Sequence, residues 1–236
     1  RIAEVPNGMT EARVNGNLLI IPEHNAWLHD YRQPPDVDWI TFQIARDVSR
    51  VWWQQVAISD TGGHQLLTEA VPILQGLKAI KNKWSQIKQT AFVDLLSDTY
   101  LRERTLEDQL EASVISLTDE KYASTKALLA LYSSEQLLGS AQFEACLKQL
   151  FNRYRGINVP PYLNTEKVFE RLVKNAPNTD SKNFLLKLFK TTRHYDFQVA
   201  SAKAVSQSDK KYQLKTELLA TEFIYKEGKD DEIMYQ

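Results

Sequence analysis

The chain has 236 residues, of which 43% are hydrophobic and 25% are charged, a composition typical of a globular protein. Its 29 basic and 30 acidic residues leave a net charge of −1, so it lacks the basic field that attracts nucleic acid, and we expect no nucleic-acid partner. No stretch approaches the roughly 20 apolar residues that a membrane-spanning helix needs. Because the chain begins at Arg1 and not at a methionine, we expect it to be a piece of a longer protein.

The N-terminal region predicts a short strand followed by a long helix. Residues 18–21 form an apolar run that ends at a proline, after a turn signal at 14–17. The helix opens at two consecutive prolines, with Asp36 or Asp38 as its cap, and continues to about residue 56. We expect its core-facing stripe to be the apolar residues at helical spacing, namely Ile40, Ile44, Val48, Val51 and Trp52.

Six more helices are predicted from apolar periodicity and from residues that break helices. Their expected bounds are 66–77, 84–104, 121–138, 140–154, 164–174 and 179–189. Pro72 should kink or shorten the first of these helices. Ser140 is expected to cap the fourth, which contains the single cysteine, Cys146, expected to be a buried and unreactive thiol.

The apolar period changes from helical spacing to alternation after residue 190. Residues 197–205 and 212–218 alternate as strands do, and the polar segment 206–211 lies between them. This pattern predicts an antiparallel hairpin. We therefore expect a helical domain at 1–190 and a β-hairpin or partial β-sandwich at 191–236.

One pattern in the first long helix carries chemical information. Residues 46–54 read Arg-Asp-Val-Ser-Arg-Val-Trp-Trp-Gln, and eighteen residues separate Arg50 from Glu69. This resembles the gluzincin motif of aminopeptidase-N-like zinc peptidases, His-Glu-x-x-His-x-Trp-Trp-Gly, with a third ligand glutamate eighteen residues after the second histidine. In a working motif of this kind the histidines at i and i+4 bind zinc, and the glutamate between them is the general base.

The resemblance extends over most of the chain. Segments 8–53 and 84–189 are similar in order to a bacterial subgroup in which the peptidase domain is fused to permease helices of ABC-transporter type. Residues 126–132 resemble a helix of that subgroup, and Tyr195-Asp196 resembles the start of its C-terminal β domain. The resemblance implies a mainly α fold, a thermolysin-like (zincin) C-terminal helical lobe followed by a short antiparallel β segment. It also implies an extracytoplasmic or periplasmic place in a membrane protein, whose partners are the parent chain's membrane helices and a peptide or partner protein.

The departures from the motif predict that catalysis has been lost. Arg46 and Arg50 occupy the two histidine positions, and a guanidinium has no lone pair to donate to a metal. Asp47 stands at the general-base position and is one methylene shorter than glutamate. The family's transition-state tyrosine corresponds to Ser124, which is too short to reach an oxyanion. We therefore expect no catalytic residue and no zinc, although Glu69 remains.

The sequence allows two interpretations of Arg46 and Arg50. They either form a solvated charged face of an amphipathic helix, or replace zinc and pair with Asp47 and Glu69. Candidate binding residues are Glu23, which loosely matches the glutamate that grips a substrate amino terminus, together with Trp52, Trp53 and Tyr122. We expect the two tryptophans to be core residues more than stacking platforms.

The functional expectation is a catalytically inactive aminopeptidase-like domain that acts as a protein-binding, peptide-binding or structural module. The alternative is an active zinc metallo-aminopeptidase with a non-standard ligand set. The scattered histidines, His24, His29, His64 and His194, do not have the spacing of a ligand set on a helix. A helical scaffold unrelated to peptidases is the third possibility.

Overall fold

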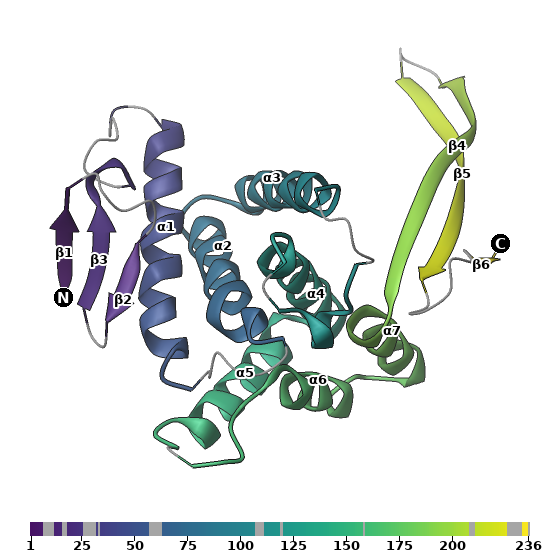
Figure 1. The fold of residues 1–236 in the computed structure, drawn as a ribbon. Coiled ribbons are helices and arrows are strands. Elements are labelled where there is room, and N and C mark those ends of the chain that lie inside the picture. Colours follow the sequence, from purple (N-terminus) through teal and green to yellow (C-terminus); the bar gives the residue numbers. More distant parts are fainter. Residues whose placement is uncertain are drawn as a thin grey trace.

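The structure is a computed structural model, and it describes residues 1–6, 12–15, 18–25, 32, 34–56, 63–106, 111–118, 120–157, 159–207, 211–225 and 233–235. A small N-terminal sheet lies beside a helical body, from which a two-stranded arm projects (Figure 1). The elements are β1 (Ile2–Val5), β2 (Arg13–Asn15), β3 (Leu18–Pro22), η1 (Glu23–Asn25), α1 (Pro34–Trp53), η2 (Leu66–Ala70), α2 (Val71–Lys83), α3 (Gln86–Arg104), η3 (Val114–Ser116), α4 (Ala123–Leu138), α5 (Ser140–Tyr154), α6 (Thr165–Lys174), α7 (Thr179–Lys190), β4 (Thr192–Gln207), β5 (Lys211–Tyr225) and β6 (Ile233–Tyr235).

The N-terminal sheet has the order β1-β3-β2 and packs on α1. β1 runs parallel to β3, whereas β2 is antiparallel to it. The strand predicted at 18–21 is confirmed as β3, whose Leu19 and Ile21 are buried together with Ala12. The two residues between β2 and β3, where a turn was predicted, lie outside the described part of the chain. β1 and β2 were not predicted, because strands this short carry too few alternating positions to be recognised.

The buried face of α1 differs from the predicted one. Ile40 is buried as expected, but Ile44, Val48 and Trp52 are exposed. The helix instead buries a mixed stripe that contains Phe42, Gln43, Asp47, Arg50 and Trp53. Its N-terminus also differs: α1 begins at Pro34, and Asp38 lies inside it and forms an ion pair with Lys88 of α3, not a cap.

The next helical segment begins with a wide π-helical turn, η2, and continues directly into α2. Pro72 lies in the first turn of α2, directly after the π-helical turn, and the helix continues to Lys83, so the proline does not shorten it as predicted. α2 is the most deeply buried helix of the body, and it crosses α1 closely at Gly76, where an added β-carbon would lie 2.8 Å from the ring of Phe42.

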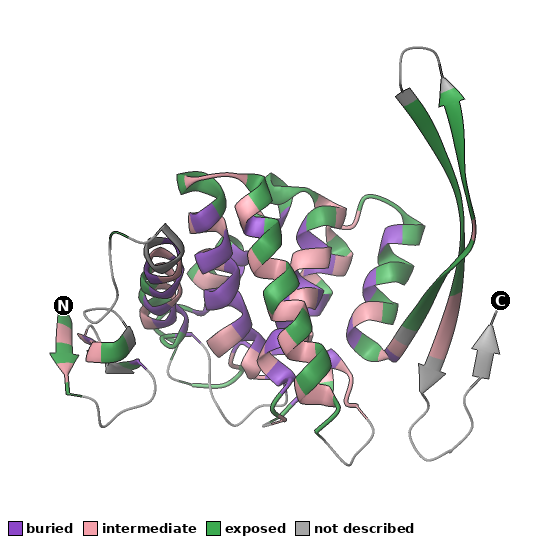
Figure 2. Cartoon of the chain, turned by 90° about the horizontal axis from the view of Figure 1, so that it is seen from above, coloured by how far each residue is buried: buried purple, intermediate pink, exposed green. Residues whose placement is uncertain are grey.

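The remaining predicted helices are confirmed as α3 to α7, with bounds that agree within two residues. Gly139, with φ of 80°, separates α4 from α5. It is the N-cap residue of α5, the position predicted for Ser140, and Ser140 is instead the first residue of the helix. Cys146 is buried in α5, and burial raises the pKa of its thiol, as expected for an unreactive cysteine. Figure 2 shows the buried residues gathered along the inner faces of these helices.

The chain changes from helix to strand between Lys190 and Thr192. β4 and β5 form the predicted antiparallel hairpin, although they are longer than expected, and residues 208–210 lie outside the described part. A bulge at Ala200 shifts the side-chain alternation by one residue. Because of this shift, one face of the arm carries mostly apolar residues along its whole length, among them Phe197, Val199, Tyr212, Leu214 and Leu218. Figure 2 shows the arm largely exposed.

Candidate functional site

The two arginines of α1 meet two carboxylates at the junction with η2. We call Arg46, Asp47, Arg50 and Glu69 the arginine–carboxylate cluster. Arg50 donates from Nη2 to Oε2 of Glu69, and its Nη1 lies 3.5 Å from Oδ1 of Asp47. Arg46 donates from Nε to the same Asp47 oxygen at 2.9 Å. One guanidinium therefore links carboxylates from two elements, and the predicted pairing of Glu69 with an arginine is confirmed.

The cluster combines two cationic with two anionic side chains at different depths. Asp47 is 1% exposed and lies at the bottom, while the Glu69 side chain is 26% exposed and lies near the surface. Within the described residues, Oδ2 of Asp47 and Nε of Arg50 have no hydrogen-bond partner. A buried charge is tolerated when it is paired, so each member of the cluster depends on the others to offset its loss of solvent. The arginines are not a solvated helix face.

The residues at this junction do not fit a zinc ion. Both guanidinium groups lack a lone pair, and the Glu69 carboxylate, the one family ligand retained, is engaged by Arg50. The described residues contain no group of three histidine, cysteine, aspartate or glutamate side chains that could hold a metal elsewhere, while His29 lies outside them. The donor set at the junction is suited to carboxylates and not to cations.

The other candidate residues lie on different elements. Ser124 is half-buried in the first turn of α4, the helix that packs against η2. Glu23 is half-buried in η1, directly after β3. Tyr122 is not a surface binding residue: it is 2% exposed, its hydroxyl accepts from the Ala112 backbone N–H at 3.0 Å, and its ring packs edge-on against Tyr100.

The aromatic pair of α1 is divided between core and surface. Trp53 is 8% exposed and packs edge-on against Phe151 of α5, with ring centroids 5.6 Å apart. Trp52 is 59% exposed, so the expectation that it belongs to the core is wrong. Both tryptophans line an open pocket of about 290 Å³ with residues of α2 and α5, namely Gln75, Glu144, Leu147, Lys148 and Phe151. Sequence reasoning missed this pocket because α5 lies about 100 positions away along the chain.

Comparison with known proteins places the fold. No protein-family model matches the chain, and no curated protein sequence matches it. Solved structures do match, among them two of an M1 zinc metallopeptidase from Deinococcus radiodurans, both glutamate-to-alanine mutants. One of these is bound to a Tyr-Ser-Ala substrate; it has a TM-score of 0.56 and 16% identity, and the alignment covers 80% of this chain and 38% of that chain. The other has a TM-score of 0.56, 15% identity and coverage of 80% and 39%.

The fold is therefore mainly helical and similar to that of M1 zinc metallopeptidases, compatible with their C-terminal helical lobe followed by a short antiparallel sheet. The aligned part spans about two fifths of the length of those structures.

Proposed function

We propose that this chain is a catalytically inactive aminopeptidase-like domain that serves as a protein-binding, peptide-binding or structural module of a larger membrane-associated, transporter-type protein. The observation that carries the proposal is the Arg50–Glu69 ion pair, which joins α1 to η2 through two residues that the sequence resemblance matches to zinc ligands. A guanidinium supplies the positive charge that the retained carboxylates need, without the coordination chemistry.

The same cluster leaves no group to activate water. In a metallopeptidase the metal lowers the pKa of its bound water, and a free carboxylate takes the proton. Here Asp47 is buried and engaged by both arginines, so it is not available as a base. Ser124 has no side chain long enough to stabilise a tetrahedral oxyanion in the way that a tyrosine does.

A binding role is supported by the pocket that Trp52 and Trp53 line at the C-terminal end of α1. Trp52 is largely exposed at the rim of the pocket that it shares with Phe151, and an exposed indole next to a concavity is typical of a recognition site. The extracytoplasmic location and the membrane partners rest on the sequence resemblance of segments 8–53 and 84–189. Among the described residues, no helix is long and apolar enough to cross a membrane.

The catalytic part is tested by metal content and turnover together. The protein is purified without added metal, its zinc is measured by elemental analysis, and cleavage of an aminoacyl reporter is compared with that of Glu69→Ala. We expect substoichiometric zinc and identical background rates for the two proteins. One zinc per chain that a chelator removes, with cleavage that disappears on its removal, would establish the alternative, an active zinc metallo-aminopeptidase with a non-standard ligand set.

The binding part is tested on a peptide library with Trp52→Ser. We expect this variant to lose peptide binding while its circular dichroism stays unchanged. Leu186→Ser is the matched control, because Leu186 is also an exposed apolar residue on a helix, 42% exposed, but lies outside the pocket. Equal binding by Trp52→Ser and the parent protein would exclude this surface as the recognition site.

A further inference from the structure

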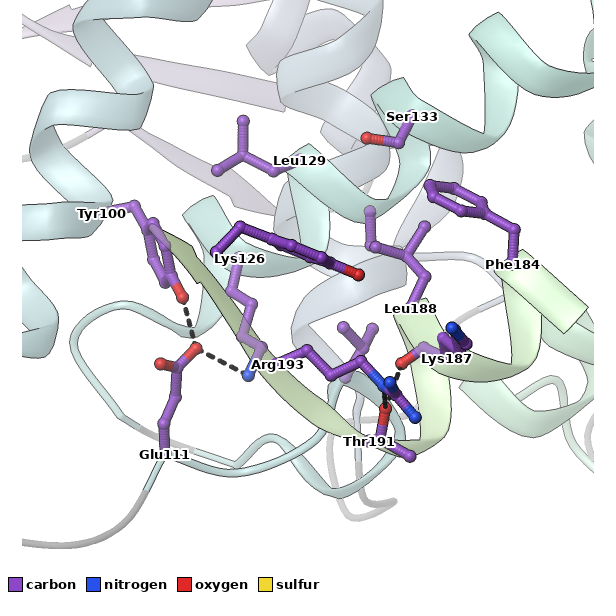
Figure 3. A pocket seen from close by; sticks show the side chains of 13 residues that line it. Tyr100, Glu111, Lys126, Leu129, Ser133, Phe184, Lys187, Leu188, Thr191 and Arg193 are labelled. Atoms are coloured by element: carbon purple, nitrogen blue, oxygen red, sulfur yellow. Dashed lines mark hydrogen bonds and ion pairs between the residues drawn. The ribbon is translucent and has the colours of Figure 1, made fainter. Parts of the chain in front are cut away.

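A second cavity lies on the other side of the helical body, where α3, α4, α7 and the base of β4 meet. It measures about 280 Å³. Its walls are mostly apolar, with Val114, Leu129, Phe184 and Leu188 among them. Figure 3 shows side chains from these elements around the space, with the Tyr100–Glu111–Lys126 contacts at one end and the Arg193–Thr191 contact at the other. Small-molecule sites have this character, apolar walls with a few polar groups, and this volume is just below their usual range.

Positive charge is in excess around the cavity. Three of the charged side chains that line it are basic, namely Lys126, Lys187 and Arg193, and one is acidic, Glu111. Glu111 pairs with Lys126 at 2.6 Å, and Glu222, which lies beside the cavity, pairs with Arg193 at 2.7 Å. Lys187 Nζ is 3.8 Å from Glu222, beyond hydrogen-bonding distance, so its ammonium has donors to offer a ligand. The cavity therefore favours a negatively charged ligand.

This cavity is separate from the arginine–carboxylate cluster. The residues of α4 that line it are Lys126, Leu129, Ala130 and Ser133, which form one stripe at helical spacing. At about 100° per residue, Ser124 points from the opposite face of the same helix. A ligand here would not contact Arg50 or Glu69, so the cavity can be tested independently of the lost zinc site.

We propose that the cavity binds an organic carboxylate with an apolar body about the size of an aromatic side chain. The body lies between Leu129, Phe184 and Leu188, and the carboxylate accepts from Lys187 and Arg193. A monovalent carboxylate fits better than a phosphate, because Glu111 and Glu222 already offset part of the positive charge. Arginine also suits the planar carboxylate group. Such a group occurs at the C-terminus of a peptide that ends in an apolar residue and in small free acids.

The test compares matched acids and amides by titration calorimetry on the whole chain. The first pair is N-acetyl-phenylalanine and its amide, which differ only in the charge of the terminal group. We expect the acid to bind saturably and the amide at least about tenfold more weakly, as the loss of a charge-assisted hydrogen bond requires. The second pair, Ala-Ala-Phe and its C-terminal amide, shows whether the carboxylate comes from a peptide C-terminus or from a small free acid. If the tripeptide acid binds as well as N-acetyl-phenylalanine, the ligand is a chain terminus; if it binds much more weakly, the ligand is a small free acid.

Two variants locate the binding. Lys187→Gln should weaken binding of the acid by about 3–10-fold and leave binding of the amide unchanged. Lys190→Gln is its control, since Lys190 is an exposed lysine of the same helix that pairs with Glu166 and does not line the cavity. Ser133→Phe fills the space and should abolish binding, with circular dichroism as the check that it folds. Equal affinity for acid and amide, absence of saturable binding of the acid, or full binding by a folded Ser133→Phe would each overturn the proposal.

Discussion

Arg50 donates from Nη2 to Oε2 of Glu69, nineteen positions further along the chain, and thereby ties α1 to η2. The same guanidinium lies 3.5 Å from Asp47 through Nη1. An ion pair thus joins the two elements whose residues the sequence resemblance matches to metal ligands. We make three predictions about this junction, one about the crossing of α1 and α2, and one about the arm.

Removal of Glu69 should destabilise the fold by an intermediate amount. The pair is neither fully buried nor open to water, since the Arg50 side chain is 11% exposed and that of Glu69 is 26% exposed. We expect Glu69→Ala to lower the free energy of unfolding by about 1–3 kcal/mol, between the values for exposed and buried ion pairs. Urea titration measures the change. Glu144→Ala is the control, because Glu144 also forms an ion pair, with Lys78, but is 59% exposed. Its replacement should lower the free energy of unfolding by at most about 1 kcal/mol. Equal costs for the two variants would contradict the prediction.

Asp47 should be the most sensitive member of the cluster. It is 1% exposed and contacts both arginines, so Asp47→Asn would leave two guanidinium groups facing a neutral amide. We expect a loss of about 3–5 kcal/mol, the cost of an uncompensated buried charge. The reference is Asp94→Asn on the exposed side of α3, which should stay within about 0.5 kcal/mol of the parent protein in the same urea titration. A loss below about 1 kcal/mol for Asp47→Asn would mean that water reaches and screens the cluster.

Replacement of both arginines by histidine should create a zinc site. Arg46→His/Arg50→His places two imidazoles at i and i+4 on α1, with the Glu69 carboxylate as a third ligand from η2. We expect one zinc per chain by elemental analysis and a rise in melting temperature with added zinc. Addition of Glu69→Ala to the double variant should remove most of the zinc affinity. If the double variant folds and still binds no zinc, the side chains do not converge as a metal site requires.

Gly76 should not tolerate a side chain, although alanine is the better helix former. A β-carbon there would lie 2.8 Å from Cδ2 of Phe42 and 2.9 Å from its carbonyl oxygen, so α1 and α2 would have to separate. The gain in helix propensity is about 1 kcal/mol, and the cost of overpacking is about 1–3 kcal/mol. We therefore expect Gly76→Ala to lower the melting temperature. The control is Asn82→Ala, at an exposed position of α2, which should not lower the melting temperature. If Gly76→Ala also leaves the melting temperature unchanged, α1 and α2 are less closely packed than described.

Glu222 should stabilise the base of the arm in a pH-dependent way. The hydrogen bond from Tyr195, followed by that from Arg193, lowers the pKa of Glu222, while burial and Glu222 itself raise the pKa of Tyr195 to about 12 and keep the phenol a donor. A carboxyl group whose pKa is lower in the folded state contributes stability above its unfolded pKa, and the contribution disappears as pH falls through the folded pKa. Glu222→Gln should therefore lower stability by up to about 1 kcal/mol near neutral pH.

The difference between Glu222→Gln and the parent protein should vanish at acidic pH. We expect urea titrations of the two proteins to converge as the pH falls through the lowered pKa of Glu222 in the folded state, because the carboxylate is then protonated. Glu217→Gln, on the same strand and bonded only to the hydroxyl of Ser201 among the contacts described, is the control and should show a smaller change at both pH values. A stability difference that persists unchanged into acid would show that the effect does not arise from the charge.

Much of this arrangement could be predicted from the sequence. The apolar period of 3.6 located the seven helices, Gly139 marked the boundary between α4 and α5, and the change to alternation after residue 190 predicted the hairpin. The resemblance of residues 46–69 to a zinc-ligand motif predicted that Glu69 pairs with Arg46 or Arg50, because the matched positions of that motif converge on one point, and the pair is the one with Arg50. These features depend on residues that are near in the chain or on one known spacing.

The tertiary structure decided which faces those elements bury. The sequence favoured Ile44, Val48 and Trp52 as the core side of α1, and the structure instead buries Asp47 and Arg50. A charged side chain can be buried only where a partner from another element meets it, and periodicity within one helix contains no information about that partner. The two cavities follow the same rule. Each is lined by side chains from at least three elements, so its shape and charge exist only once those elements have packed together.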